Sequence, residues 1–259
     1  MAVSNITSSL ISQSLGDQKA TQQSSKTTSD PVTNALKHAS DRIEQQIGST
    51  KVQLSAYGQI KGAFSEVQAA GRTLSDTKKA ATTEDVRKAV TGFVSAFNKA
   101  NKTVAAATQG AGKQAGALAN DARASIAGND LRRSVTEGNA LSDLKKIGIT
   151  QNKDGSLAVD TKLLDKALQA NPDQVRSTVA NIGQQVEKTA AQELGDNGNV
   201  GRSVNTLSNR SRNLETQQST QQEQLAAAQR LVDQQTAQLD NHNNGVASGA
   251  TAYQRTFNA

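Results

Sequence analysis

The chain has 259 residues, of which 35% are apolar and only 2% are aromatic, with no cysteine and no tryptophan. The absence of cysteine excludes a disulfide framework, a thiol nucleophile and a zinc thiolate site. The formal net charge of +6 would suit nucleic acid. However, basic and acidic residues are interspersed, and no aromatic residue lies between the basic ones for base stacking. Solvated helix faces explain the charge better, and we expect no nucleic-acid partner.

A composition rich in Ala, Gln, Ser and Thr favours slender helical bundles in which each helix buries a narrow stripe. We do not expect a thick core, and self-assembly would supply the burial that a thin bundle lacks. No segment approaches about 20 consecutive apolar residues, so we expect no membrane insertion. The first 30 residues are polar, are expected to be disordered in isolation, and lack the apolar run of a secretory signal.

Residues 31–79 are predicted to form one long helix, which begins at Pro31, a residue suited to a first helical turn. Apolar residues recur there in alternating steps of three and four, the period of a coiled coil. By this count the core positions are Leu36, Ala39, Ile43, Gln46, Thr50, Gln53, Tyr57, Ile60, Phe64, Val67, Gly71 and Leu74. Polar residues fill the middle of the stripe, which favours a partner with a polar middle.

A second long helix is predicted over 202–241, where the same period continues without glycine or proline. Its core positions are Val204, Leu207, Ser211, Leu214, Gln218, Gln221, Leu225, Ala228, Val232, Gln235 and Leu239. Here too the polar positions cluster in the middle, so we predict that the two long helices pair antiparallel. The predicted bundle and assembly interface comprises Leu36, Ile43, Tyr57, Ile60, Phe64, Val67, Leu207, Leu214, Leu225, Val232 and Leu239. The alternative is that both are ordinary surface helices of a globular bundle.

Shorter helices are predicted between the two long ones, over about 83–107, 118–135, 161–171 and 172–194. The third ends before Pro172, because the residue before a proline is pushed out of the helical region. The link at 109–116 contains Gly112-Lys113, which resembles half of a phosphate-binding loop. The spacing does not match the required glycine, four residues, then Gly-Lys-Ser/Thr. We therefore expect no nucleotide binding.

Two β-prone runs flank the pair Asp154-Gly155, so a small hairpin is predicted near 147–160. Asp160 is then placed to cap the next helix. Asn152, Asp154 and Asp160 could also suggest a calcium loop, but the glycine comes too early for that pattern. A turn and a helix cap explain these residues better.

The sequence carries no pattern of a catalytic or metal site. His38 and His242 lie on the two long helical segments with no paired ligand nearby in sequence, and we expect them to be exposed. Neither Gly-x-Ser-x-Gly nor His-Glu-x-x-His occurs. We therefore predict a protein that is not an enzyme and that binds no cofactor and no metal.

The order of elements around the hairpin is shared with a known family. The run Leu144–Val175 carries most of the similarity, with the sequence LKKIGITQNKDGSLAVDTKLLDKALQANPDQV. Further matching segments are Phe93–Asn98, Leu118–Asp121 with Leu131-Arg132, Leu54–Lys61 and Leu74–Asp76. Together these residues resemble the flagellar filament cap protein family, also called flagellar hook-associated protein 2, over most of residues 32–240.

This resemblance implies a structural component of the bacterial flagellum that caps the filament tip and promotes flagellin assembly. It implies a ring-like homo-oligomer whose partners are flagellin, hook-associated junction proteins and an export chaperone. It also implies an extracellular protein, exported by the flagellar type III apparatus without a cleaved signal peptide, with roles in motility and cell adhesion. The family usually has a β-rich variable insertion after its first long helix, and here only about Lys79–Thr82 fills that place.

We therefore predict a mainly α fold in which long antiparallel N- and C-terminal helices form a coiled-coil-like bundle with shorter helices and one small β-hairpin. The expected parts are an export and assembly segment (1–30), a long helix (31–79), a helical core with the hairpin (80–201), a second long helix (202–241) and a flexible assembly segment (242–259). The alternative function is a soluble coiled-coil adaptor, or a filament or junction protein derived from the cap fold.

Overall fold

The computed structural model describes residues 31–78, 82–110 and 115–257, and of 31–33 and 243–257 it describes the helical backbone alone. The predicted disordered segment 1–30 lies outside the described residues, as do residues 79–81 and 111–114 of the two predicted links. The described chain is mainly helical with one small sheet, which confirms the predicted fold class. It divides into two units: unit 1 contains residues up to Gly48 and from Arg212 onward, and unit 2 is Ser49–Ser211.

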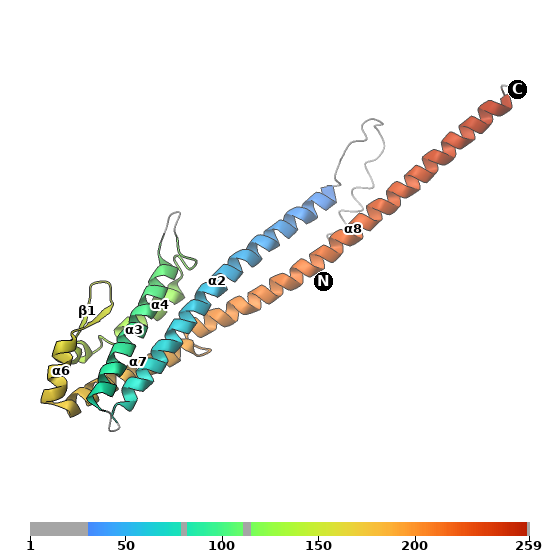
Figure 1. Cartoon of the computed structure of the whole chain (residues 1–259). Helices are drawn as coiled ribbons and strands as arrows, with labels where there is room; N and C mark the ends of the chain where they lie inside the picture. Colours follow the sequence, from blue (N-terminus) through green and yellow to red (C-terminus); the bar gives the residue numbers. More distant parts are fainter. Residues whose placement is uncertain (1–30, 79–81, 111–114, 258–259) are drawn as a thin grey trace. The chain divides into compact units, whose positions relative to one another are not determined.

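The described elements follow the predicted order (Figure 1). They are α2 (Pro31–Asp76), α3 (Thr83–Thr108), α4 (Ala122–Arg133), α5 (Ala140–Lys146), β1 (Ile149–Gln151), β2 (Leu157–Val159), α6 (Thr161–Ala170), α7 (Pro172–Leu194) and α8 (Asn199–Phe257). Helix α4 begins four residues later than predicted, because Asp121 accepts a hydrogen bond from the Ala124 N–H and so acts as its N-cap. Helix α5 was not predicted, since its seven residues are too few to show a helical period.

Side-chain caps explain where α3, α6 and α7 begin. At α3, Thr82 accepts from the Asp85 N–H at 3.2 Å and the Asp85 carboxylate accepts from the Thr82 N–H at 3.1 Å, a reciprocal capping box. At α6, Asp160 accepts from the N–H groups of Lys162 and Leu163, both at 3.0 Å, as the sequence predicted. At α7, Asn171 is the cap.

The predicted hairpin is present, with β1 and β2 antiparallel and Ile149 opposite Val159. Its turn places Gly155 at a φ of +81°, a conformation that glycine adopts without strain. The Asp154 carboxylate accepts from the N–H and hydroxyl of Ser156, so this residue builds the turn. The Asn98 amide of α3 pairs with the N–H and C=O of Leu157 at 2.7 and 2.8 Å, which attaches the edge of β2 to α3.

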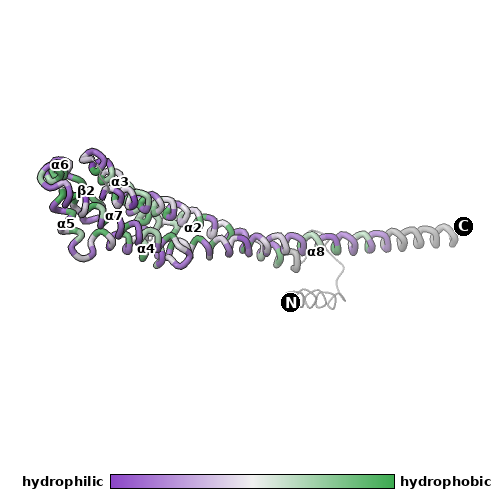
Figure 2. The backbone as a smooth tube through the Cα atoms, turned by 90° about the horizontal axis from the view of Figure 1, so that it is seen from below, coloured by the Kyte–Doolittle hydropathy of each residue, from purple (hydrophilic) through white to green (hydrophobic). Residues whose placement is uncertain are grey.

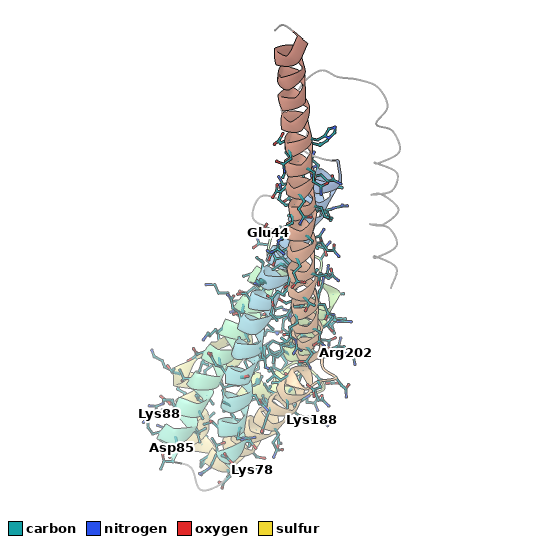
Figure 3. The ribbon with its side chains drawn as sticks, turned by 90° about the vertical axis from the view of Figure 1, so that its right-hand side faces the viewer. Glu44, Lys78, Asp85, Lys88, Lys188 and Arg202 are labelled. Atoms are coloured by element: carbon teal, nitrogen blue, oxygen red, sulfur yellow. The ribbon has the colours of Figure 1, made fainter. Side chains whose placement is uncertain are left out.

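Unit 2 has one contiguous apolar core, to which α2, α3, α4, α6, α7 and the hairpin contribute. Three of the four phenylalanines lie in it, and the Phe93 and Phe97 rings are 5.9 Å apart. The core is therefore more substantial than the overall composition predicts, because the few aromatic residues are concentrated there. Charged side chains such as Lys78, Lys88 and Lys188 project from the surface of this unit (Figure 3).

Helices α2 and α7 cross at two glycines. A Cβ added at Gly183 would lie 2.5 Å from the Gly71 carbonyl oxygen and 2.6 Å from the Leu74 Cβ. A Cβ added at Gly71 would lie 2.9 Å from the Gly183 carbonyl oxygen. The two backbones are therefore in direct contact, and neither glycine position has room for a side chain.

Unit 1 consists of the first part of α2 and the part of α8 from Arg212 onward, which run in opposite directions (Figure 1). The Gln221 side-chain amide donates to the Leu36 carbonyl oxygen at 3.4 Å. Helix α8 continues as helix past the predicted boundary at 241 to Phe257. Its two late glycines cost about 1 kcal/mol each relative to alanine, and no proline stops it. Along the described side chains of this part, hydrophilic residues predominate (Figure 2).

Candidate assembly interface

In unit 2, the predicted interface residues belong to the core. Tyr57, Ile60, Phe64 and Val67 of α2 are at most 1% exposed and lie in the same apolar cluster. Leu207 of α8 is half-buried and packs against that cluster. These side chains hold unit 2 together, so they do not present a surface to another molecule.

A buried tyrosine lies where three segments that are distant in sequence meet. The Tyr57 hydroxyl donates to an Asp121 carboxylate oxygen at 2.8 Å, and the same oxygen accepts from the Ala124 N–H at 3.0 Å. Ser203 of α8 lies beside Tyr57 and Asp121. Burial raises the pKa of Tyr57 to about 12, and the neighbouring Ser203 hydroxyl opposes part of that rise. The hydroxyl therefore remains a proton donor that connects α2 to the start of α4, next to the start of α8.

In unit 1, the predicted interface residues become more exposed along α8. Leu214 is 5% exposed, Leu225 and Val232 are half-buried, and Leu239 is 64% exposed. On α2, Leu36 and Ile43 are half-buried. Leu231, which the heptad count did not include, is 52% exposed. The structure therefore brings part of the predicted stripe against α2 and leaves the rest of the stripe on the surface.

The heptad count missed three buried residues of α2, Ile47, Ala56 and Ala63. Ile47 is 7% exposed, whereas the neighbouring Gln46, which the count placed in the stripe, is exposed. The stripe passes from Ile43 through Ile47 to Thr50, in steps of four and three. A straight helix has 3.6 residues per turn and drifts against a strict 3.5-residue repeat. A helical-period analysis of apolar residues alone would have found Ile47.

A buried carboxyl group lies at the turn between α7 and α8. Glu193 is 7% exposed and accepts hydrogen bonds from the N–H and the side-chain amide of Asn199 at 3.0 and 3.1 Å. Burial raises the pKa of Glu193, the bonds from Asn199 oppose the rise, and the Asp130 carboxyl of α4 adds to it. Sequence reasoning did not identify Glu193, since no pattern around it indicates burial.

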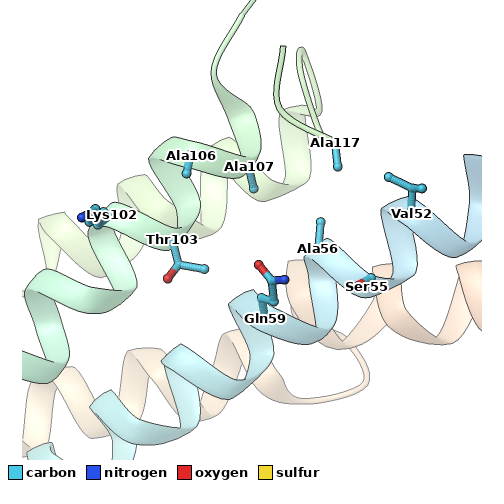
Figure 4. Close-up of a pocket in the computed structure, with 9 residues that line it drawn as sticks. All are labelled: Val52, Ser55, Ala56, Gln59, Lys102, Thr103, Ala106, Ala107 and Ala117. Carbon is cyan, nitrogen blue, oxygen red and sulfur yellow. The ribbon is translucent and has the colours of Figure 1, made fainter. Parts of the chain in front are cut away.

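A hollow of about 530 Å³ lies between α2 and α3 in unit 2 (Figure 4). Alanines and short polar side chains line it, among them Ala56 and Gln59 of α2 and Thr103 and Ala107 of α3. Among the described residues that line this hollow, Lys102 is the one ionisable side chain.

Among the described residues, no three His, Asp or Glu side chains lie close enough together to hold a metal ion. His38 and His242 are exposed, as predicted. No helix in the described part of the chain has an apolar stretch long enough to cross a membrane. Lys113, part of the rejected phosphate-loop pattern, lies outside the described residues.

These features define a mainly helical protein, with a packed core in unit 2 and a partly uncovered apolar stripe on α8. A family model described as flagellar hook-associated protein 2 C-terminus matches residues 73–248, more than half of the chain. The chain therefore belongs to the flagellar hook-associated protein 2 family, as the sequence resemblance indicated, and is a structural component of the bacterial flagellum. No match was found among curated proteins.

Proposed function

We propose that this protein caps the tip of the flagellar filament and promotes the addition of flagellin subunits there. Membership of the flagellar hook-associated protein 2 family supports this function. The observation that carries the proposal further is the exposed apolar surface of α8, where Leu231 and Leu239 are more than half exposed. Exposed apolar residues on a helix are suited to contacts with other subunits.

Polar residues interrupt the apolar stripe, and this supports contacts that are weak and reversible. Gln218 and Gln221 occupy core positions and are half-buried. A polar residue at a coiled-coil core position specifies register at a cost in stability. Contacts of this kind suit a cap that must shift each time a subunit enters the filament.

The proposal includes the location and partners of the protein. It is exported by the flagellar type III apparatus without a cleaved signal peptide, with the help of an export chaperone, and acts outside the cell. There it forms a ring-like homo-oligomer next to flagellin and the hook-associated junction proteins. It has no enzymatic activity.

A deletion in the source bacterium tests the capping function. A strain without the protein should release flagellin monomers into the medium, carry short or no filaments, and fail to swim. The wild-type gene should restore all three properties. Leu239→Glu should not, because a charge replaces an exposed apolar contact residue, whereas the exposed neighbour Gln238→Glu serves as the matched control. Normal filaments and no free flagellin in the deletion strain would contradict capping.

A second candidate is a coiled-coil adaptor, or a filament or junction protein derived from the cap fold. It is favoured by the direct connection of α2 to α3 through residues 77–82, where the family usually has a large insertion. Light scattering of the purified protein over a concentration series distinguishes the two candidates. The cap predicts growth toward a ring-sized oligomer as the concentration rises. An adaptor predicts a constant mass.

A further inference from the structure

A second hollow in unit 2, of about 620 Å³, has a different chemistry from the one between α2 and α3. It lies between the C-terminal end of α4 and the residues that follow β1. Neither the apolar core nor the proposed capping function uses it. Its lining includes three cationic side chains, Arg132, Arg133 and Lys153.

Arg132 is held in place without being neutralised. Its Nη1 donates to the Asn101 side-chain oxygen at 2.8 Å, and its Nη2 donates to the Asn129 side-chain oxygen. Its Cδ lies beside Gly155, where an added Cβ would come within 2.6 Å of it. Both acceptors are neutral amides, and no carboxylate among the described residues forms an ion pair with Arg132. A half-buried guanidinium with fixed orientation and uncompensated charge attracts an anion.

The other charges around this hollow are also predominantly positive. Arg133 has its ion-pair partner Asp130 at 3.7 Å, too far for a hydrogen bond. Lys153 is exposed, and the described residues provide it with no ion pair. Among the described lining residues, the single carboxylate is that of Asp154, which already accepts two hydrogen bonds from Ser156. The described lining therefore carries three cationic side chains and one carboxylate, which is already hydrogen-bonded.

The hollow also borders free backbone groups of the hairpin. The Asn152 N–H donates to the Ser156 carbonyl oxygen, and the Asp160 N–H donates to the Gly148 carbonyl oxygen, both at 2.8 Å. Because hydrogen-bonded pairs alternate along an antiparallel ladder, the N–H and C=O of Gln151 point away from β2. An extended peptide can pair with such groups at a strand edge.

We propose that this hollow binds an acidic, extended segment of a partner protein, whose carboxylates pair with Arg132, Arg133 and Lys153. A carboxylate fits better than a phosphate, because the Asp154 charge and the carbonyl end of α4 repel an anion of higher charge. None of the described residues that line the hollow is aromatic, so these residues offer nucleic-acid bases no stacking surface. The inference is independent of the capping function.

The test is calorimetric titration of the full-length protein with the peptide Gly-Glu-Glu-Glu-Glu-Gly amide at low and physiological salt. The matched peptide contains four glutamines instead. We expect saturable binding of the glutamate peptide, at least tenfold tighter than the glutamine peptide. Arg133→Glu/Lys153→Glu should weaken it at least tenfold. Both side chains are exposed, so the variant should fold, and circular dichroism checks this. Lys153→Arg should bind as the wild type does.

The control variant Lys162→Glu/Lys188→Glu carries the same change of net charge on exposed residues outside the hollow. It should keep the wild-type affinity within about twofold. Equal weakening in this control would mean that the peptide responds to net charge, and the proposal would fall. Absence of saturable binding would also overturn it. So would inorganic phosphate binding more tightly than the peptide and displacing it, since the hollow would then be a phosphate site.

Discussion

The two units of this protein differ in how their apolar residues are used. In unit 2, apolar side chains from several helices and the hairpin meet in one cluster, and most of its members are nearly inaccessible to solvent. In unit 1, Ile47 and Leu214 are the buried apolar residues among the described side chains, whereas Leu231 and Leu239 of α8 are exposed. Burial stabilises a fold in proportion to the apolar area removed from water. Unit 2 therefore has the larger internal source of stability, and unit 1 leaves more of its apolar surface exposed.

The largest expected difference between the units comes from deleting a large side chain in each. Phe64→Ala removes a ring that is 0% exposed in unit 2 and should lower the free energy of unfolding by about 3–5 kcal/mol. Leu231→Ala in unit 1 removes a side chain that is 52% exposed and should change it by less than about 0.5 kcal/mol. Urea unfolding measures both. Equal losses would contradict the difference between the units.

A smaller effect is expected at the α2–α7 crossing. Gly183→Ala should destabilise unit 2 by about 1–3 kcal/mol, because the new Cβ would overlap the backbone of α2. Gly62→Ala is the matched control: no atom lies within 4 Å of its added Cβ, and the helix should gain about 0.5–1 kcal/mol. Thermal unfolding should shift in opposite directions for the two variants. A neutral Gly183→Ala would show that the helices separate easily.

The pairing in unit 1 can be broken without disturbing unit 2. Leu225→Asp places a charge at a half-buried position of α8 and should weaken the local pairing by about 1–2 kcal/mol. Hydrogen exchange should accelerate in residues 34–48 and 212–242, while the core of unit 2 keeps its protection. Gln222→Asp, at an exposed position on the same helix, should leave exchange unchanged. Unaltered exchange in the Leu225→Asp variant would refute the predicted pairing.

The smallest expected change is a pH dependence confined to unit 2. Burial raises the pKa of Glu193, so the folded protein holds this proton more tightly than the unfolded chain. Its contribution to stability is full below the ordinary pKa of about 4.3 and is lost as the pH rises through the raised value. Glu193→Gln should therefore become more stable relative to the wild type between pH 4 and pH 7. Unfolding curves at both pH values measure this, and exposed Glu137→Gln should show no such trend.

Local features were predictable because their causes are local. The Asp154-Gly155 turn, the Asp160 cap and the end of α6 before Pro172 each depend on residues a few positions apart. The buried stripe of α2 was predicted less well. A helix with 3.6 residues per turn drifts against a 3.5-residue repeat, and this drift decides whether Gln46 or the adjacent Ile47 is buried. Short helix α5 and buried Glu193 carried no local signal.

By itself, the sequence determined the helical class, the order of the elements, the hairpin and the family resemblance, since these follow from periodicity, caps and turns along the chain. Only the tertiary structure decided that Tyr57, Ile60, Phe64 and Val67 belong to a core while Leu239 remains exposed, although all five occupy heptad core positions in the sequence. It also decided the glycine crossing of α2 and α7 and the cationic hollow beside the hairpin. The physical reason is that burial and charge compensation depend on which segments meet in space. A periodic apolar stripe does not specify which segment packs against it.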